Sequence, residues 1–421
     1  MTVDYKNIQK KMVFFAKCML VFGIIYNHTI MSFSSVFSSE RIAVFVLMAI
    51  IIMSGKIIIK KDYPYKYIKN MLLFQSFLFV YTLMLIAIIG KGEGTNILGS
   101  IGNYLIMVPL EYIGLTYIFH DRDEFMHAIL VVTLFQCIII LGGMLNDDIR
   151  YFVDEIYNQN EYFDYSLYRT KGYPGGIACI TSTGSLQISM GIIACLHFIQ
   201  NKAKNIKYMI CFAFISVMMT AVSRTGLVIA IVGAVLIFRE SLYIPSKKLG
   251  KLVLTTCAGM FIACIGILVF DIGDFITDMF RRVLKGNIGA FFNAYFNADT
   301  TIIPGLSFKT MIGTGILSGT SGNGVSVNAD GGFVRTYVAL GLPLCMIFYY
   351  GIIILFKKII SYTKDKSIKA VLLCCCLIFW IGEFKEPFFY TRYLQVIMFV
   401  YLYLAVKGKG TSIEEEYDNK K

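Results

Sequence analysis

Charged residues are scarce in this sequence of 421 residues: Asp, Glu, Lys and Arg together make up 16%, against 57% hydrophobic residues. A folded chain with so few polar side chains could not cover its surface toward water, and the mean hydropathy of +0.68 points the same way. These values exclude a soluble enzyme and predict a polytopic membrane protein whose main partner is the lipid bilayer. The net charge of +12 does not indicate nucleic-acid binding. Lys and Arg lie between the apolar runs, where their distribution indicates which side of the membrane each loop occupies.

Metal-binding and disulfide patterns are also missing. The chain has only 4 histidines, and its 11 cysteines all lie in apolar segments without a CxxC pair. We therefore expect no metal, no cofactor and no disulfide, and we interpret the run Cys374 to Cys376 as core packing. The apolar stretch from Met12 to Met31 lacks a small-residue cleavage site, so we expect it to remain as the first helix.

Ten apolar runs are long enough to cross a bilayer, which takes about 20 residues. They are 12–31, 42–59, 70–89, 97–119, 125–145, 176–199, 250–270, 333–356, 367–383 and 387–406. A further apolar stretch, 208–238, is interrupted in its middle by Ser223, Arg224, Thr225 and Gly226. It could form one long helix or a hairpin of two short ones.

The distribution of basic residues favours the hairpin. With a hairpin, segments 239–251, 357–369 and 407–421 are cytoplasmic and carry 13 Lys and Arg, whereas a single span would place the sparsely basic 271–332 loop inside. The prediction is an all-α protein with about twelve transmembrane helices, a single membrane domain over 1–421 and both termini cytoplasmic. Its two large extracytoplasmic loops would be 146–175 and 271–332, and its cytoplasmic tail 407–421.

Arg224 stands at the tip of this hairpin and is the first candidate for binding an anion. An arginine is costly to place near lipid, and its guanidinium offers two parallel donors to phosphate oxygens. The helix that opens at Thr225 adds backbone donors at its positive end. Snorkelling to lipid headgroups is the alternative interpretation.

Other polar groups gather at the predicted outer ends of spans. Arg169 and Lys171 precede the sixth span, whose serines, threonines and Gln187 predict a helix that lines a wet cavity, with hydrogen bonding between helices as the alternative. The stretch 313–332 holds seven glycines, which predicts a mobile loop. It contains no P-loop motif, so nucleotide binding is not expected. It contains Asp330, and Arg335 follows it at the start of the next span.

Several ionisable groups remain. Glu383, Lys385, Glu386 and Arg392 cluster between the last two spans, which is more charge than a simple connector needs. Lys17 and Glu111 lie inside spans and are expected to pair with each other as a structural feature. His28, near the outer end of the first span, is either a base or a polar cap.

Taken together, the SRTG hairpin, the IGTG and NADGGFVRTYVALGLP segments and the late EFKEP turn resemble bacterial surface-polysaccharide polymerases of the O-antigen polymerase (Wzy) type. The resemblance covers most of the chain from Arg169 to Arg392. It implies a GT-C-like membrane glycosyltransferase of the bacterial cytoplasmic (inner) membrane that polymerises undecaprenyl-diphosphate-linked repeat units on the outer face. It also implies a chain-length regulator as a partner, and Arg169, Arg224 and Arg335 as functional arginines.

The expected chemistry assigns roles to these residues. A departing diphosphate needs fixed cations, which Arg169, Lys171, Arg224, Arg335 and Arg392 can supply without a metal. The acceptor hydroxyl needs a base, for which the candidates are Asp330, Glu383, Glu386 and His28.

Three other functions stay open at this point. They are an O-antigen ligase-type transferase, a lipid-linked oligosaccharide flippase and a membrane glycan O-acyltransferase. A flippase should show two similar halves and cations in a central cavity, and no such repeat is visible here. An acyltransferase would need a catalytic His near the first spans, and His28 meets this only in part because no arginine accompanies it.

Overall fold

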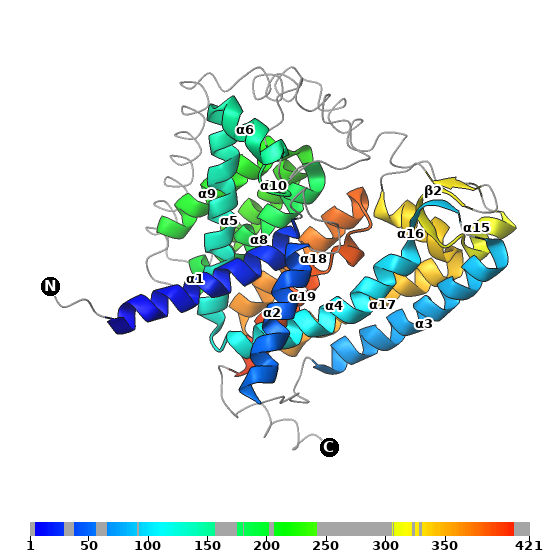
Figure 1. Cartoon of the computed structure of the whole chain (residues 1–421), viewed down its shortest axis with the longest axis horizontal. Helices are drawn as coiled ribbons and strands as arrows, with labels where there is room; N and C mark the ends of the chain where they lie inside the picture. Colours follow the sequence, from blue (N-terminus) through cyan, green and yellow to red (C-terminus); the bar gives the residue numbers. More distant parts are fainter. Residues whose placement is uncertain are drawn as a thin grey trace. The chain divides into compact units, whose positions relative to one another are not determined.

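The computed structural model describes residues 5–28, 38–55, 65–90, 92–155, 175–179, 181–201, 206–241, 305, 307–321, 325–327 and 331–407. This part of the chain is mostly helical and divides into two compact units. The first unit comprises Met1–Gly55 and Gly114–Asn287, and the second comprises Lys56–Ile113 and Ile288–Lys421. Figure 1 shows the order of the elements along the chain.

The described residues contain six helices that are long and apolar enough to cross a membrane, which confirms a multi-pass, helical membrane class. They are Tyr65–Ile89, Ile97–Ile118, Arg122–Leu145, Ser182–Gln200, Leu342–Tyr362 and Lys366–Lys385. Three shorter apolar helices accompany them, at Ile206–Val222, Thr225–Ile237 and Tyr393–Lys407. The predicted span 250–270, most of the 271–332 loop and the tail after Lys407 lie outside the described residues.

The first unit is a bundle around a buried central helix. Its helices are α1 (Tyr5–Tyr26), α2 (Ser39–Ser54), α5 (Arg122–Leu145), the short α6 (Asp147–Val153), α8 (Thr181–Asn201), α9 (Ile206–Val222) and α10 (Arg224–Ser241), together with the end of α4 (Ile97–Ile118). The central helix is α8, which contacts α5, α9 and α10. Apolar burial of α8 on several sides explains why it lacks an exposed hydrophobic stripe.

The predicted hairpin at 208–238 is present in this unit. Helix α9 ends at Val222 and α10 begins at Arg224. A methyl group built on Gly233 would lie 3.1 Å from the ring of Phe212, although a continuous helix would separate these residues by about 30 Å. Gly226 likewise approaches the carbonyl of Met219. The chain therefore reverses at Ser223, and α9 and α10 run antiparallel.

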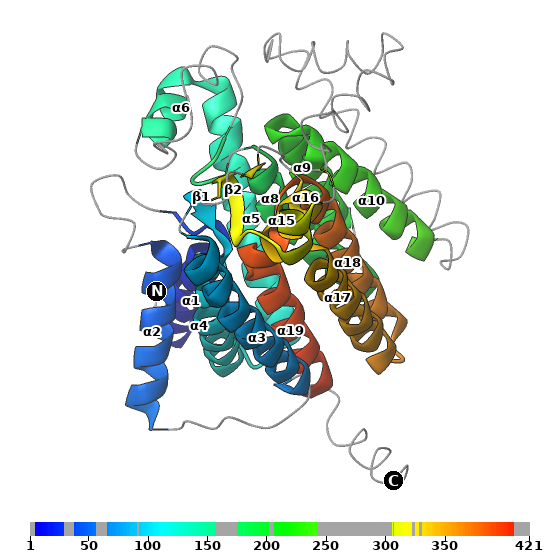
Figure 2. The same ribbon diagram turned by 90° about the vertical axis from the view of Figure 1, so that its right-hand side faces the viewer.

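The second unit pairs long helices with a small capping layer. It contains α3 (Tyr65–Ile89), most of α4, β1 (Glu93–Asn96), α15 (Phe308–Ile312), β2 (Ile316–Thr320), β3 (Ser326–Val327), α16 (Gly332–Leu340), α17 (Leu342–Tyr362), α18 (Lys366–Lys385), the 3-10 helix η3 (Phe388–Thr391) and α19 (Tyr393–Lys407). Figure 2 shows α3, α17, α18 and α19 running side by side, with β1, β2, α15 and α16 at one end. We call this the sheet end.

The three strands form an antiparallel sheet in the order β1-β2-β3, which the sequence analysis did not predict. Glu93 pairs with Thr320 and Thr95 with Ser318, so the α3–α4 connection is tied to a segment more than 200 residues later. The glycine-rich stretch expected as a mobile loop thus supplies β2 and β3. Its Gly313, Gly315 and Gly319 all have positive φ, which glycine adopts without a steric cost.

The predicted span 333–356 is wrong as a single helix. It is divided into α16 and α17 at Gly341, which has a φ of +81°. A side chain at Gly341 would collide with the backbone of Met311 and Ile312, so α15 packs directly on the break. Pro343 in the first turn of α17 then suits a helix start.

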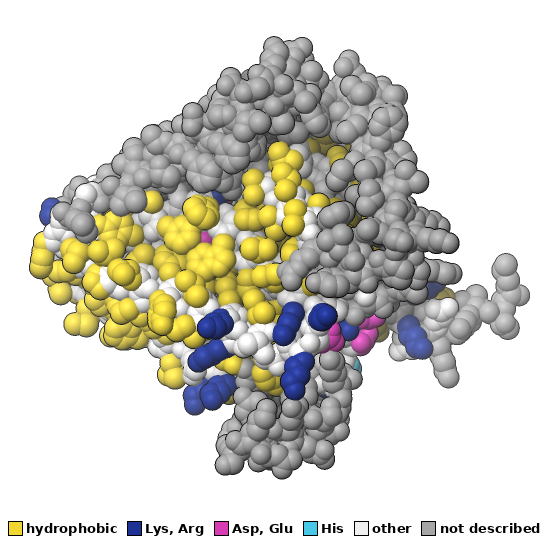
Figure 3. All heavy atoms as spheres, turned by 180° about the vertical axis from the view of Figure 1, so that it is seen from behind, with side chains coloured by type: hydrophobic (Ala, Val, Ile, Leu, Met, Phe, Trp, Pro, Cys, Tyr) yellow, Lys and Arg dark blue, Asp and Glu magenta, His cyan; other side chains and the backbone are white. Residues whose placement is uncertain are grey.

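The other end of the second unit is basic. Exposed lysines lie at the start of α3, at the end of α17 and at the start of α18; they are Lys66, Lys69, Lys357, Lys358, Lys364 and Lys366. Figure 3 shows a face on which hydrophobic side chains form a broad surface, with Lys and Arg side chains gathered along one edge. The long helices expose large apolar residues, including Leu73, Phe77, Met346 and Tyr350, which suits contact with lipid rather than water.

Candidate functional site

The turn between α18 and α19 is anchored by a buried carboxylate. Glu383 is fully buried, and the Tyr349 hydroxyl donates to its Oε1 at 2.6 Å. The Phe389 backbone N–H donates to its Oε2 at 2.9 Å. Both carboxylate oxygens are therefore engaged, so Glu383 holds η3 in place. This arrangement favours a positioning role for Glu383 over the predicted role of base.

Helix α16 begins directly against this turn. A methyl group on Gly332 would overlap the carbonyl of Glu386 and come within 2.7 Å of the carbonyl oxygen of Glu383. Only glycine allows so close an approach between two backbones. Arg335 lies three residues further on, and residues at this spacing share one face of a helix. The contact at Gly332 therefore places the half-buried Arg335 near the turn.

Aromatic side chains fix α16 against α17 and α18. The ring of Phe333 stacks on Trp380 with a centroid distance of 5.9 Å and an interplanar angle of 1°. The same ring lies 4.7 Å from Tyr349, the residue that binds Glu383. Phe384 meets Phe333 edge-on at 5.1 Å. Such pairs stabilise beyond the area they bury, so the start of α16 is rigidly held.

Arg392 is the second arginine at this end and has an unusual backbone. Its φ of 66° and ψ of −48° are close to the classic γ-turn, which is strained for a residue other than glycine. Its carbonyl accepts from the N–H groups of Gln395 and Val396 and so starts α19. Its guanidinium donates to the carbonyl of Tyr390 at 3.4 Å.

The surrounding polar groups support this conformation. The Gln395 amide donates to the Phe389 carbonyl at 2.8 Å and accepts from the Tyr104 hydroxyl at 2.6 Å. Tyr104 also stacks on Phe389, with centroids 4.9 Å apart.

The strain at Arg392 gives a test of whether this side chain is functional. Arg392→Gly should relax the backbone and keep or raise the thermal stability of the protein, because glycine removes a cost of about 1–3 kcal/mol. If the guanidinium serves the reaction, activity should nevertheless fall at least tenfold. Thermal unfolding in detergent and polymer analysis of the same preparation measure both. An Arg392→Gly variant that is less stable and fully active would show that the arginine is retained for structure alone.

The structure thus brings four of the predicted residues to the sheet end of the second unit, namely Glu383, Glu386, Arg335 and Arg392. His28 belongs to the first unit, just after α1, where its ring meets Phe22 edge-on at 5.6 Å. Arg224 opens α10 in the first unit, immediately after the break at Ser223. Three others lie outside the described residues; they are Arg169, Lys171 and Asp330.

The prediction that the sixth span lines a wet cavity is wrong for the polar groups whose bonds are defined. In α8, the Ser185 hydroxyl donates to the Met219 carbonyl at 3.0 Å and lies 2.7 Å from the Ser223 hydroxyl. The Gln187 amide donates to the Ile25 carbonyl at 3.1 Å. These side chains join α8 to α1 and to the hairpin, because buried hydroxyls and amides in a bundle find partners on neighbouring helices.

The charged pair expected between Lys17 and Glu111 is also wrong. Lys17 Nζ lies 2.6 Å from Glu124 Oε1 and above the ring of Phe119. Close by in the sequence, Asp123 Oδ1 lies 3.0 Å from Nε2 of the fully buried His197. The pair of Asp123 and His197 was not predicted from the sequence. The signal that could have found it is the acidic first turn of a helix, which favours a cationic or hydrogen-bonding partner.

No group of three or more His, Cys, Asp or Glu side chains suited to a metal ion occurs among the residues that the structure describes. The groups that could act on an anion at the sheet end include the guanidinium groups of Arg335 and Arg392. Comparisons with known proteins found no matching protein family, curated protein or solved structure.

Proposed function

We propose that the protein is a metal-independent glycosyltransferase that polymerises polyprenyl-diphosphate-linked oligosaccharide repeat units on the outer face of the bacterial cytoplasmic membrane. The observation that carries the proposal is the uneven distribution of arginines and lysines between the two ends of the second unit. Arg335 and Arg392 lie at its sheet end together with Lys309 and Lys385, whereas the six exposed lysines named above lie at its other end. An anionic, membrane-bound substrate needs cations at one surface.

The orientation follows from the lysines. Basic residues near the ends of spans are retained on the cytoplasmic side. The lysine-rich end then faces the cytoplasm, and the sheet end with its two arginines faces outward. Twelve spans, a GT-C-like fold and cytoplasmic termini belong to this proposal, together with the resemblance to Wzy-type polymerases.

A pair of cysteine variants tests this orientation. Thr320, in β2 at the sheet end, and Ser361, near the end of α17, are both exposed. Thr320→Cys should react with an impermeant thiol reagent in intact cells, whereas Ser361→Cys should react only after lysis, with the unsubstituted protein as the background control. The reverse pattern would contradict the proposed topology.

The proposed reaction uses these groups as follows. The anomeric carbon of the growing chain loses its bond to the diphosphate and forms a bond to a hydroxyl of the incoming repeat unit. Arg335 and Arg392 stabilise the negative charge that develops on the departing diphosphate. Arg224 and Arg169 are further candidates for this role from the sequence alone. The proton of the attacking hydroxyl passes to a base, for which Asp330, Glu386 and His28 remain the candidates. Glu383 positions the turn between α18 and α19, which contains Arg392 and contacts the start of α16.

Glycan analysis of a strain lacking the gene distinguishes this function from its rivals. Loss of a polymerase should leave single repeat units on the cell surface. Loss of a flippase should leave none, loss of an O-acyltransferase should keep the chain length, and loss of a ligase should leave long chains on the polyprenyl carrier. Only the first outcome supports polymerisation. A chain-length regulator from the same pathway is the expected protein partner.

A further inference from the structure

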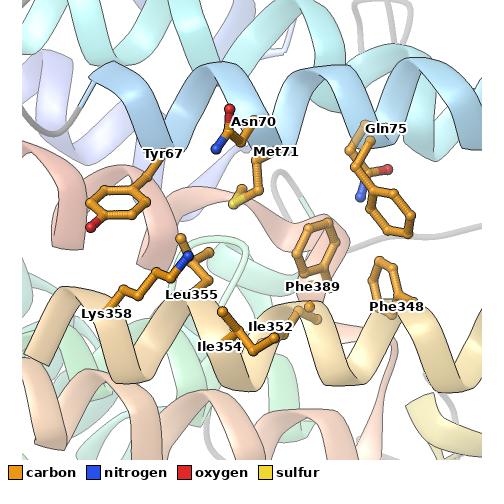
Figure 4. A pocket seen from close by; sticks show the side chains of 12 residues that line it. Tyr67, Asn70, Met71, Gln75, Phe348, Ile352, Ile354, Leu355, Lys358 and Phe389 are labelled. Atoms are coloured by element: carbon orange, nitrogen blue, oxygen red, sulfur yellow. The ribbon is translucent and has the colours of Figure 1, made fainter.

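A groove lies between α3 and α17 in the second unit and runs from Lys358 at the lysine-rich end to Phe389 in η3. Its volume is about 200 Å³, which is many times the roughly 10–15 Å³ that one water needs. Apolar side chains line most of it, among them Met71, Phe74, Phe348 and Ile352. Figure 4 shows Tyr67, Asn70 and Lys358 toward one end and Gln75 toward the other.

Gln75 is an unusual residue for such a place. It is fully buried, yet none of the described residues hydrogen-bonds its Oε1 or its Nε2. Figure 4 shows its amide directed from α3 into the groove. A buried amide without a partner is destabilising in hydrocarbon, where water is not available. The groove therefore provides a donor and an acceptor for a ligand that enters from the membrane.

The other end of the groove is cationic. Lys358 lines it, and Lys66, Lys69 and Lys357 are exposed on the same end of the unit. Asn70 and Tyr67 add neutral donors beside Lys358. Lysines at this depth attract the anionic headgroups of the adjacent leaflet. Asn70 and Gln75 are five residues apart on α3, which is about 7.5 Å along the helix.

We propose that this groove binds one anionic glycerophospholipid. The phosphate lies at Lys358 and Asn70, an ester carbonyl a few atoms further along accepts from the Gln75 amide, and an acyl chain lies along Phe74 and Phe348. An apolar occupant would leave Gln75 unsatisfied, and a zwitterionic phospholipid would bring a further cation to a surface that already carries Lys66, Lys69 and Lys358. The proposal does not depend on the proposed reaction, because its phosphate-binding end is at the lysines, although the groove extends to Phe389 in η3.

Binding can be measured by native mass spectrometry of the full chain in detergent, titrated with defined lipids. Phosphatidylglycerol should be retained about tenfold better than phosphatidylcholine with the same acyl chains. Inorganic phosphate should not compete, which separates a lipid headgroup from a free anion. An ether-linked phosphatidylglycerol, which lacks the ester carbonyls, should bind more weakly than the ester lipid.

Three variants locate the site, each with a matched control. Lys358→Ala should lower the retention of phosphatidylglycerol about tenfold, whereas Lys357→Ala, at an exposed neighbour that does not line the groove, should change it less than twofold. Gly351→Leu should abolish retention, because nothing lies within 4 Å of a side chain built there and the new side chain fills the groove. Gly351→Ala is its control and should retain the lipid.

Gln75→Leu provides the most specific readout. It should weaken binding of the ester lipid but leave binding of the ether lipid unchanged, and it should raise the melting temperature in lipid-free detergent. The proposal would be overturned by equal retention of the two headgroups, by unchanged binding in Gly351→Leu, or by an equal loss of ester and ether lipids in Gln75→Leu.

Discussion

Replacing Arg335 with lysine is expected to lower the rate of polymerisation about a hundredfold while the protein is inserted at normal abundance. A planar guanidinium can bind two phosphate oxygens at once, whereas an ammonium is a point charge with a different reach. Losing such a contact to a developing diphosphate costs about 3 kcal/mol. Gel analysis of polymer length and quantification of the protein in membranes measure the two quantities.

Arg150 offers a matched control for this substitution. Its guanidinium pairs with the exposed carboxylate of Asp147 at 2.8 Å, a contact that any cation can make. Arg150→Lys should therefore leave polymer length unchanged. Arg224→Lys should behave like Arg335→Lys, and Arg169→Lys more mildly because Lys171 is adjacent in the sequence. Full-length polymer from both Arg224→Lys and Arg335→Lys would end the proposed role of these arginines.

Adding one methyl group at Gly332 should be nearly as damaging, for a reason that involves no charge. In Gly332→Ala the new carbon would overlap the carbonyl of Glu386, so α16 must move away from the turn. We expect a loss of about 1–3 kcal/mol in stability and at least a tenfold loss of activity, because Arg335 moves with the helix.

Gly351→Ala is the matched control, since a methyl group there meets nothing within 4 Å. It should keep activity and raise stability by up to ~1 kcal/mol, the difference in helix propensity between the two residues. Thermal unfolding in detergent and polymer analysis of both variants compare the effects. Equal behaviour of the two alanine variants would show that the contact between α16 and the turn is not critical.

The sequence predicted those features that depend on local composition. Apolar runs of the right length predicted the positions of α3, α4, α5, α8 and α18, because a bilayer selects length and hydropathy directly. The polar interruption at Ser223, combined with the count of basic residues, predicted the reversal between α9 and α10. Hydropathy, run length and the distribution of basic residues can all be read from a single sequence.

Features that depend on distant contacts were not predictable. The break at Gly341 follows from packing against Ile312, and the strand at Glu93–Asn96 forms only because it pairs with Ile316–Thr320. Neither strand has the alternating pattern that would reveal it. Lys17 was assigned the wrong partner, because hydropathy places two charges at one depth without saying which side chains meet.

The candidate site shows the same division. The charges of Glu383, Arg335 and Arg392 drew attention because ionisable groups near a membrane are costly. The sequence could not show that Tyr349 and the Phe389 N–H occupy the Glu383 carboxylate, nor that Arg392 has a positive φ. Those contacts favour a positioning role for Glu383 over the role of base.

The central claim is tested most directly by supplying the purified full chain in lipid nanodiscs with polyprenyl-diphosphate-linked repeat units, in EDTA and without nucleotide sugars. The account predicts a ladder of glycan products, each longer by one repeat unit, and a ladder that nearly disappears in Arg335→Lys. Products that remain single repeat units with the unsubstituted chain, or elongation that requires a divalent ion, would contradict it.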